Sequence, residues 1–235
     1  MQPPKIVSHE EWLEARKALL VKEKEFTRLR DALSRERQAL PWERVEKDYR
    51  FEGPDGQEGL SDLFEGRNQL MVYHFMFGPD WEEGCVACSF FSDHLDPAVV
   101  HLAQRDVTLI AVSRAPHDKL AAFKARMGWQ FKWVSSYGSD FNRDYGVSFS
   151  EEELAGESVT YNYVTQPFPS TEAPGLSVFC KAEDGTLCHS YSTYGRGLDM
   201  FITAYHYLDT VPKGRDEAGF DFTMQWLRFH DRYGD

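Results

Sequence analysis

The stretch QLMVYHFMFGPDWEEGCVACSFF, residues 69–91, decides how this chain folds. Residues 69–77 are rich in apolar, aromatic and β-branched side chains, which is typical of a strand buried on both faces of a sheet. Cys85 and Cys88 follow as Cys-Val-Ala-Cys, and a helical pattern runs from residue 89 to about residue 104. We therefore expect a buried strand, a Cys-x-x-Cys pair and a core helix in direct succession.

The sequence on either side of this stretch predicts a mixed sheet. Pro116 suits the first position of a helix that ends at Gly128, and Asp184-Gly185 is a strong signal for a two-residue hairpin loop. The predicted strands cover residues 46–51, 69–77, 106–113, 131–134, 175–181 and 186–191, and a final core helix covers 196–207. This order indicates an α/β fold with helices on both faces of a mixed central sheet.

Three regions are predicted along the chain: a helical extension over 1–41, the α/β domain over 42–211 with an insertion at 135–172, and a tail over 212–235 ending in an aromatic helix from 224 to 233. Ser8 and Glu11 form a capping box, and the helix that follows should end near residue 38, before Pro41. Its apolar residues recur every seven positions: Trp12, Leu19, Phe26 and Leu33. We expect this helix to lie on the domain or on a partner subunit, and a homodimer formed through it is one of the two interpretations.

Composition and charge exclude several classes of function. The formal net charge of −12 argues against a general binder of nucleic acid or of anionic membranes, because such proteins need basic surface. No apolar run approaches the length of a membrane span, and residues 1–11 carry no secretory h-region. We therefore expect a cytoplasmic protein, where four cysteines in so long a chain do not form a disulfide scaffold.

The position of Cys85 has a chemical consequence. A cysteine at a helix N-terminus faces unpaired backbone N–H groups and the positive end of the helix dipole, which favour the thiolate. The thiolate is the species that attacks a disulfide, and two intervening residues bring the second thiol within reach. We predict Cys85 as the nucleophile and Cys88 as the resolving thiol, with no cofactor and an external thiol reductant. The substrate would be a protein or small-molecule disulfide.

Two other interpretations of the pair stay open. Cys-x-x-Cys is half of a zinc site, but no second such motif is present, and Cys180 and Cys188 have the wrong spacing for a zinc knuckle. The pair could also be inert. Glu82 and Glu83, just before Cys85, either raise its pKa by repulsion or are solvated loop carboxylates with little effect.

Pro174, the second cysteine pair and two aspartates are further candidates. Pro174 directly precedes a predicted strand whose start should lie next to the cysteines, and we expect a cis peptide bond there, which makes Pro174 the third predicted site residue. With a two-residue loop, residue 181 would pair with 188, so Cys180 and Cys188 should point to opposite faces and serve in packing. We expect capping or surface roles for Asp93 and Asp96.

The succession of strand, Cys-x-x-Cys, helix and later Pro-strand-hairpin-helix resembles the thioredoxin superfamily. Several segments resemble its peroxiredoxin (alkyl hydroperoxide reductase) branch: Tyr49-x-Phe51, residues 53–56, residues 60–63 and residues 140–147. More closely, the chain resembles the bacterial thioredoxin-like family called domain of unknown function 899. The matching pieces are residues 40–42, 81–89, 175–179 and 212–217. The resemblance implies a thioredoxin-like fold and a dithiol–disulfide oxidoreductase, and it supplies no substrate.

The sequence also departs from the related enzymes. Peroxiredoxins carry Pro-x-x-x-Thr/Ser-x-x-Cys, but here Glu82 occupies the hydroxyl position and Pro79 is one residue too close to Cys85. A standard peroxidase activity is therefore disfavoured. The leading hypothesis is a thiol–disulfide oxidoreductase, and the alternative is a non-catalytic thioredoxin-fold module that binds partners or forms a scaffold.

Overall fold

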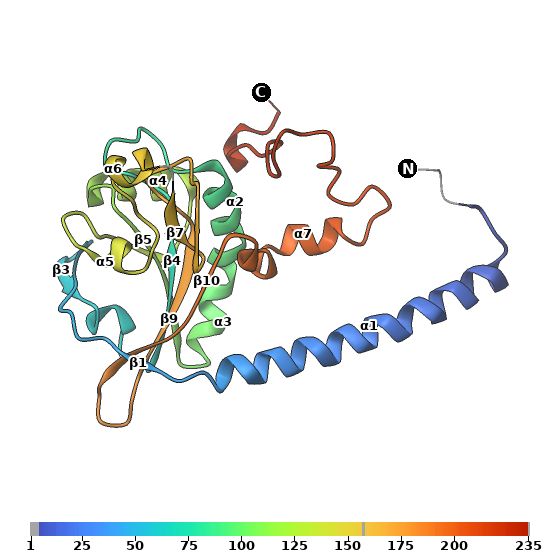
Figure 1. The fold of residues 1–235 in the computed structure, drawn as a ribbon, viewed down its shortest axis with the longest axis horizontal. Coiled ribbons are helices and arrows are strands. Elements are labelled where there is room, and N and C mark those ends of the chain that lie inside the picture. Colours follow the sequence, from blue (N-terminus) through green and yellow to red (C-terminus); the bar gives the residue numbers. More distant parts are fainter. Residues whose placement is uncertain (1–4, 157, 235) are drawn as a thin grey trace. The chain divides into compact units, whose positions relative to one another are not determined.

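The computed structural model describes residues 5–156 and 158–234 (Figure 1). Two units make up the chain, Met1–Pro41 and Trp42–Asp235. The prediction that residues 1–11 carry no secretory signal falls partly outside the described residues, which begin at residue 5. Among the helices that are described, none has both the length and the hydrophobicity that crossing a bilayer requires.

The first unit consists mainly of one helix, α1 (His9–Gln38). The predicted capping box is present: the Ser8 hydroxyl accepts the Glu11 N–H at 3.2 Å, and the Glu11 carboxylate accepts the Ser8 N–H at 3.1 Å. These two bonds satisfy donors that a helix start otherwise leaves unpaired. Taken by itself, α1 has no buried residue.

The second unit is built on an eight-stranded mixed sheet with the order β1-β10-β9-β4-β5-β6-β2-β3. Its strands are β1 (Glu43–Arg44), β2 (Arg50–Gly53), β3 (Gly56–Gly59), β4 (Gln69–His74), β5 (Val107–Ser113), β6 (Lys132–Ser135), β9 (Gly175–Lys181) and β10 (Leu187–Tyr194). The strand predicted over 46–51 is thus displaced: β2 begins only at Arg50.

Strand β4 lies at the centre of this sheet and ends at His74, three residues before the predicted end. It pairs in parallel with β5, to which α2 (Val86–Leu95) connects it, and antiparallel with β9. The neighbours β5-β4-β9-β10, with a helical segment after β10, form a thioredoxin-like arrangement. The predicted fold class is confirmed.

Apolar side chains cover both faces of the sheet. On one face, α2, α4 (His117–Met127) and the segment after β10 pack on alternate residues of β4 such as Tyr73. On the other face, a 3-10 helix (Asp62–Phe64) and α5 (Phe141–Asp144) cover Leu70 and Val72. Because β4 alternates between these two cores, its apolar run carries no polar interruption until His74.

Several helices differ from the prediction. The helix expected over 89–104 begins earlier and is interrupted: α2 ends at Leu95, a 3-10 helix covers Asp96–Ala98, and α3 covers Val99–Ala103. Pro97, which has no N–H for the helical ladder, explains the interruption. The helix expected over 196–207 consists of a 3-10 helix (Gly195–Phe201) followed by α7 (Thr203–Leu208).

The tail does not form the aromatic helix expected over 224–233. Its described residues form turns and one 3-10 helix, His230–Arg232. The insertion at 135–172 holds α5, α6 (Glu151–Ala155) and a small hairpin of β7 (Val159–Tyr161) and β8 (Val164–Gln166). Asn162 and Tyr163, both with positive φ, make the two-residue turn of that hairpin.

The register of the β9–β10 hairpin contradicts the sequence-based prediction. Lys181 pairs with Leu187, so Cys180 pairs directly with Cys188. The Ala182 N–H donates to the Thr186 carbonyl at 2.9 Å, and Gly185 adopts a positive φ of 83°. The loop is therefore longer than two residues, with glycine at its left-handed position. Cys180 and Cys188 consequently lie on the same face of the sheet, not on opposite faces.

Candidate active site

Cys85 and Cys88 lie where the central strand passes into the first core helix. Cys85 is the N-cap of α2, with an extended backbone (φ −59°, ψ 132°), and Cys88 lies in the first turn. The Cys85 N–H donates to the Met76 carbonyl at 3.0 Å, and the Ser89 hydroxyl donates to the Cys85 carbonyl at 2.9 Å. Cys85 is partly exposed and Cys88 is buried, and both carry free thiols.

Close packing fixes the loop that leads to Cys85. A Cβ atom on Gly84 would meet the Phe75 ring at 2.7 Å and the Phe123 ring at 3.2 Å, so only glycine allows this approach. From α4, the Lys119 ammonium donates to the carbonyls of Pro79 and Trp81 at 3.0 and 3.3 Å. The loop is thus held against α4, and Cys85 is presented at a defined position.

The two sulfur atoms are in different electrostatic environments. A hydrogen bond from the Cys88 thiol, assisted by the backbone N–H groups of Cys88 and Ala87, lowers the pKa of Cys85 to about 7. Burial raises the pKa of Cys88 well above its ordinary value, and its hydrogen bond to Cys85 adds to this. The Met76 N–H lies 3.5 Å from the Cys88 sulfur. At neutral pH a large fraction of Cys85 is therefore thiolate, and Cys88 is its hydrogen-bond donor.

Tyr73 is a third polar group at the sulfur atoms, and the sequence analysis did not identify it. Its side chain is 1% exposed and its hydroxyl is hydrogen-bonded to Cys88, while burial raises its own pKa. Tyr73 is the penultimate residue of β4, on the face that α2 covers. The alternation of β4 could have placed it beneath the helix, but nothing in the sequence indicates the contact with Cys88.

Glu83 does not leave an unbalanced negative charge beside Cys85. Its carboxylate is paired with the guanidinium groups of Arg126 and Arg232. Hydrogen bonds from Arg232 and Arg126 lower the pKa of Glu83. Glu82 is exposed to solvent. The structure therefore favours the interpretation in which the two glutamates have little effect on the thiol.

Pro174 lines the same cavity as Cys85 and Cys88. The peptide bond that precedes it is trans, so the expectation of a cis bond is wrong. The ladder between β9 and β4 begins with the pair Gly175 and His74, which leaves Pro174 just outside it. A proline at that point needs no N–H for the sheet and can keep the ordinary trans form.

Tyr161 connects the insertion to this part of the site. Its hydroxyl donates to the Pro174 carbonyl at 2.7 Å and accepts the Gly195 N–H at 2.9 Å. Pro174 and the start of the segment after β10 are thereby held together by one buried side chain. Tyr161 could not be predicted from the sequence, because its partners are distant along the chain and no local pattern identifies them.

A cavity of about 530 Å³ opens beside the two cysteines. Its lining includes apolar side chains from β4, the loop after it, α2 and the segment after β10: Tyr73, Met76, Phe91, Leu198 and Ile202. The rest of the lining includes residues of the segment after α7, which we call the outer wall: Asp209, Arg215, Glu217, Thr223 and Met224. A volume of this size is typical of pockets for small molecules.

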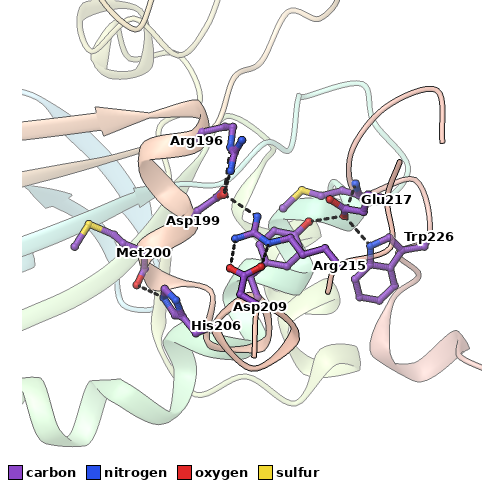
Figure 2. A network of polar contacts seen from close by, with 10 residues as sticks. Arg196, Asp199, Met200, His206, Asp209, Arg215, Glu217 and Trp226 are labelled. Carbon is purple, nitrogen blue, oxygen red and sulfur yellow. Dashed lines mark hydrogen bonds and ion pairs between the residues drawn. The ribbon is translucent and has the colours of Figure 1, made fainter. Parts of the chain in front are cut away.

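Two sets of polar contacts hold the outer wall (Figure 2). The Arg215 guanidinium pairs with Asp209 through two bonds of 2.8 and 2.9 Å, and with Asp199 at 2.9 Å. Oε1 of Glu217 accepts three bonds of 2.9 to 3.0 Å, from the Tyr205 hydroxyl, the Met224 N–H and the Trp226 indole N–H. No role for any of these residues was predicted from the sequence.

Asp93 and Asp96, the other candidates from the sequence, accept hydrogen bonds from distant parts of the domain. Asp93 accepts the Trp129 indole N–H and a ring nitrogen of His230, and Asp96 accepts the N–H groups of Gln130 and Phe131. Over residues 5–156 and 158–234, no three His, Cys, Asp or Glu side chains gather so that they could hold a metal ion. Cys180 and Cys188, the paired thiols of β9 and β10, are buried away from this cavity.

Comparisons with known proteins place the chain in a family. Residues 1–233 match a family described as "Bacterial protein of unknown function (DUF899)". No curated protein matches the chain.

Solved structures with a similar backbone include three bacterial proteins. A mutant of peroxiredoxin Q from Xanthomonas campestris is 12% identical, with 72% of this chain and 98% of that chain covered and a TM-score of 0.47. Peroxidoxin BcpB from Mycobacterium tuberculosis is 12% identical, with 70% and 94% covered and a TM-score of 0.46. A mutant of PrxQ from Xylella fastidiosa is 11% identical, with 71% and 94% covered and a TM-score of 0.45.

Proposed function

We propose that this chain, which belongs to the bacterial family of unknown function DUF899, is a thiol–disulfide oxidoreductase with Cys85 as nucleophile and Cys88 as resolving thiol. One observation carries the proposal: a partly exposed thiol with a pKa of about 7 sits at the start of α2, hydrogen-bonded to a second thiol and open to a cavity. A thiol in this state reacts near neutral pH, since its thiolate is abundant and still nucleophilic.

The first step is attack on the substrate disulfide. The Cys85 thiolate forms a bond to one sulfur of the substrate while the substrate S–S bond breaks. The other half of the substrate leaves as a thiolate and takes a proton from water. The product is a mixed disulfide between Cys85 and the retained half. Pro174 serves as part of the wall against which the substrate lies.

The second step releases the retained half. The sulfur of Cys88 attacks the sulfur of Cys85, and its proton passes to the thiolate that leaves. Because burial raises the pKa of Cys88, this thiol reacts only when the mixed disulfide is beside it. The balance is one substrate disulfide reduced to two thiols and one Cys85–Cys88 disulfide formed. An external thiol reductant must then reduce that disulfide, as the cytoplasm can supply.

A single-turnover experiment tests the proposal. Reduced protein is mixed with excess bis(2-hydroxyethyl) disulfide, and the released thiol is counted. The wild type should release two thiols per chain and end with a Cys85–Cys88 disulfide. Cys88→Ser should release one thiol and retain a mixed disulfide visible by intact mass. Cys85→Ser should release none.

The variant Cys180→Ser is the matched control, because it removes a thiol that the proposal does not use. Its release should equal that of the wild type. If the wild type releases no thiol, the chain is not an oxidoreductase, and the non-catalytic module becomes the better interpretation. Consumption of hydrogen peroxide with an added thiol, abolished by Cys85→Ser, without any disulfide reduction, would instead identify a peroxidase.

A further inference from the structure

The outer wall and the cysteine pair line the same cavity. In the segment after α7, the lining residues are Asp209, Arg215, Glu217, Thr223 and Met224. Arg215 fastens this wall to Asp199, which lies in the 3-10 helix after β10. Glu217 fastens it to Tyr205 in α7. We expect the disulfide of a folded protein, which is attached to much more bulk, to disturb these contacts when it enters the cavity, whereas a small molecule need not displace them.

The charges around the cavity are unequal. Its lining includes the carboxylates of Asp199, Asp209 and Glu217 and the guanidinium groups of Arg196 and Arg215. Both guanidinium groups are already in ion pairs with Asp199 or Asp209. Carboxylates therefore outnumber guanidinium groups by one in the lining, and both arginines have carboxylate partners.

Glu217 is the carboxylate that remains without a cationic partner among the lining residues. Its three donors are neutral groups, and all three bind the same oxygen, Oε1. Within the described part of the chain, no hydrogen bond or ion pair uses the other oxygen, Oε2. The same cavity is also lined by Tyr73, Phe91, Leu198 and Ile202. Such a site combines apolar packing with one acceptor for a cation.

We infer that the cavity binds a low-molecular-weight disulfide that has a cationic end group paired with Glu217. This inference rests on the proposed function and narrows its substrate class. The substrate places its sulfur atoms at Cys85, its carbon arms on the apolar floor and its positive charge at the Glu217 carboxylate. Anionic disulfides are disfavoured because they approach the excess negative charge, and protein disulfides are disfavoured by the wall.

Three small disulfides of nearly equal size test the preference for charge: cystamine, bis(2-hydroxyethyl) disulfide and 3,3′-dithiodipropionate. Their end groups are ammonium, hydroxyl and carboxylate. Each initial rate at pH 7 is divided by the rate of the same disulfide with free dithiothreitol, which corrects for intrinsic reactivity. We expect the corrected rates to fall in that order, with at least a fivefold ratio between the first and the last. Glu217→Gln, which keeps an oxygen acceptor for the three donors, should reduce this ratio to below two.

Insulin, a protein disulfide substrate, tests the wall. The wild type should reduce it at least 100-fold more slowly than cystamine after the same correction. Arg215→Met, which removes the ion pairs to Asp199 and Asp209, should raise the ratio of the insulin rate to the bis(2-hydroxyethyl) disulfide rate severalfold. A thermal melt of each variant establishes that it is folded.

The outcomes separate this inference from the proposed function. If all three small disulfides are reduced at equal corrected rates, or the order is reversed, the cationic preference is wrong while the oxidoreductase stands. If insulin is reduced as fast as cystamine, the wall is no barrier and the substrate class is wrong. If no disulfide is reduced at all, the proposed function itself fails.

Discussion

The protein has two close pairs of cysteines, and they differ in almost every property that governs thiol chemistry. Cys85 and Cys88 lie at the start of a helix beside a cavity, and Cys85 is partly exposed. Cys180 and Cys188 are direct partners across two antiparallel strands, with 8% and 7% of their surfaces exposed. Hydrogen bonds lower the pKa of Cys85, whereas burial raises the pKa of Cys180.

The comparison shows that proximity of two thiols does not make them reactive. Directly opposed residues in an antiparallel pair have Cα atoms about 4.5–5.5 Å apart, within the usual range for a disulfide. Cys180 and Cys188 therefore satisfy the spacing requirement. They lack a helix N-terminus, whose N–H groups have no ladder partner and can stabilise a thiolate. In a sheet those groups are used by neighbouring strands, and burial raises the pKa of Cys180, so that thiol stays protonated at neutral pH.

The largest expected difference between the pairs is in their rate of alkylation. At pH 7 and limiting iodoacetamide, Cys85 should react at least about 100-fold faster than Cys180, because a pKa near 7 leaves about half of it as thiolate. The labelled positions are measured by peptide mass spectrometry over time. The Cys85 rate should rise through a midpoint near pH 7, since the thiolate forms as pH increases.

Unfolded protein supplies the control for that measurement. In denaturant all four thiols should react at similar rates, because the differences come from the fold. Equal rates for Cys85 and Cys180 in the native protein would remove the basis of the comparison. Preferential labelling of Cys180 would assign the reactive pair to the sheet.

The second prediction concerns the backbone donors. Ala87→Pro removes an N–H that helps to lower the pKa of Cys85, while proline is tolerated in the first helical turn. Losing one hydrogen bond to a thiolate costs about 1.4 kcal/mol or more, so the thiolate fraction at pH 6 should fall about tenfold. The absorbance of the thiolate at 240 nm, followed against pH, measures this.

Val86→Pro is the matched control for this change. It places the same ring one residue earlier, at the first helical position, where the N–H is not among the groups that stabilise the Cys85 thiolate. Its titration should be close to that of the wild type. If the titration midpoint of Cys85 shifts equally in both variants, the effect comes from a disturbed loop and not from a lost hydrogen-bond donor.

Much of the fold follows from local sequence patterns. Residues 69–77 predict a buried central strand because both of its faces are covered by apolar cores, and the bounds of β9 match the predicted strand at 175–181. Helix α4 ends at Gly128, which has a φ of 71°, as a glycine that ends a helix predicts. The placement of Cys85 at a helix start follows from the same kind of local signal.

The features that the sequence did not predict have two causes. Side-chain hydrogen bonds compete with the backbone ladder, and some contacts join residues that are far apart along the chain. At the β9–β10 loop, the Asp184 carboxylate accepts the Thr186 N–H at 2.9 Å, which takes a donor from the ladder and lengthens the loop. A one-residue difference in register then places Cys188 on the same face of the sheet as Cys180 instead of on the opposite face. The cavity wall depends on ion pairs such as Arg215 with Asp199, and no local pattern specifies that these partners meet.

The third prediction concerns the role of the sheet pair. Cys180→Ala and Cys188→Ala should each lower the free energy of unfolding by about 1 kcal/mol, because each removes a buried sulfur from a packed site. Neither should change the rate of disulfide reduction by more than twofold. Urea unfolding and the single-turnover assay measure the two quantities. A large loss of turnover without loss of stability would show that the sheet pair takes part in the redox cycle.

The smallest expected effect is a change in the alkylation rate of Cys85 when the charged groups next to it are altered. The direction of this change is what tests the role of the charges. The negative charge of Glu83 is balanced by the positive charges of Arg126 and Arg232. Removing the negative charge and removing one positive charge should therefore change the thiolate fraction of Cys85 in opposite directions. Glu83→Gln leaves Arg232 without its carboxylate partner, while Arg126 keeps Asp231. The added positive charge favours the thiolate and should raise the rate of Cys85 alkylation at pH 6 about twofold. Arg232→Gln leaves excess negative charge and should lower that rate by a similar factor. Both effects should fade in 1 M salt, because screening acts over about 3 Å there. Changes of the same sign in the two variants would mean that the contacts position the loop and that their charges do not set the reactivity of Cys85.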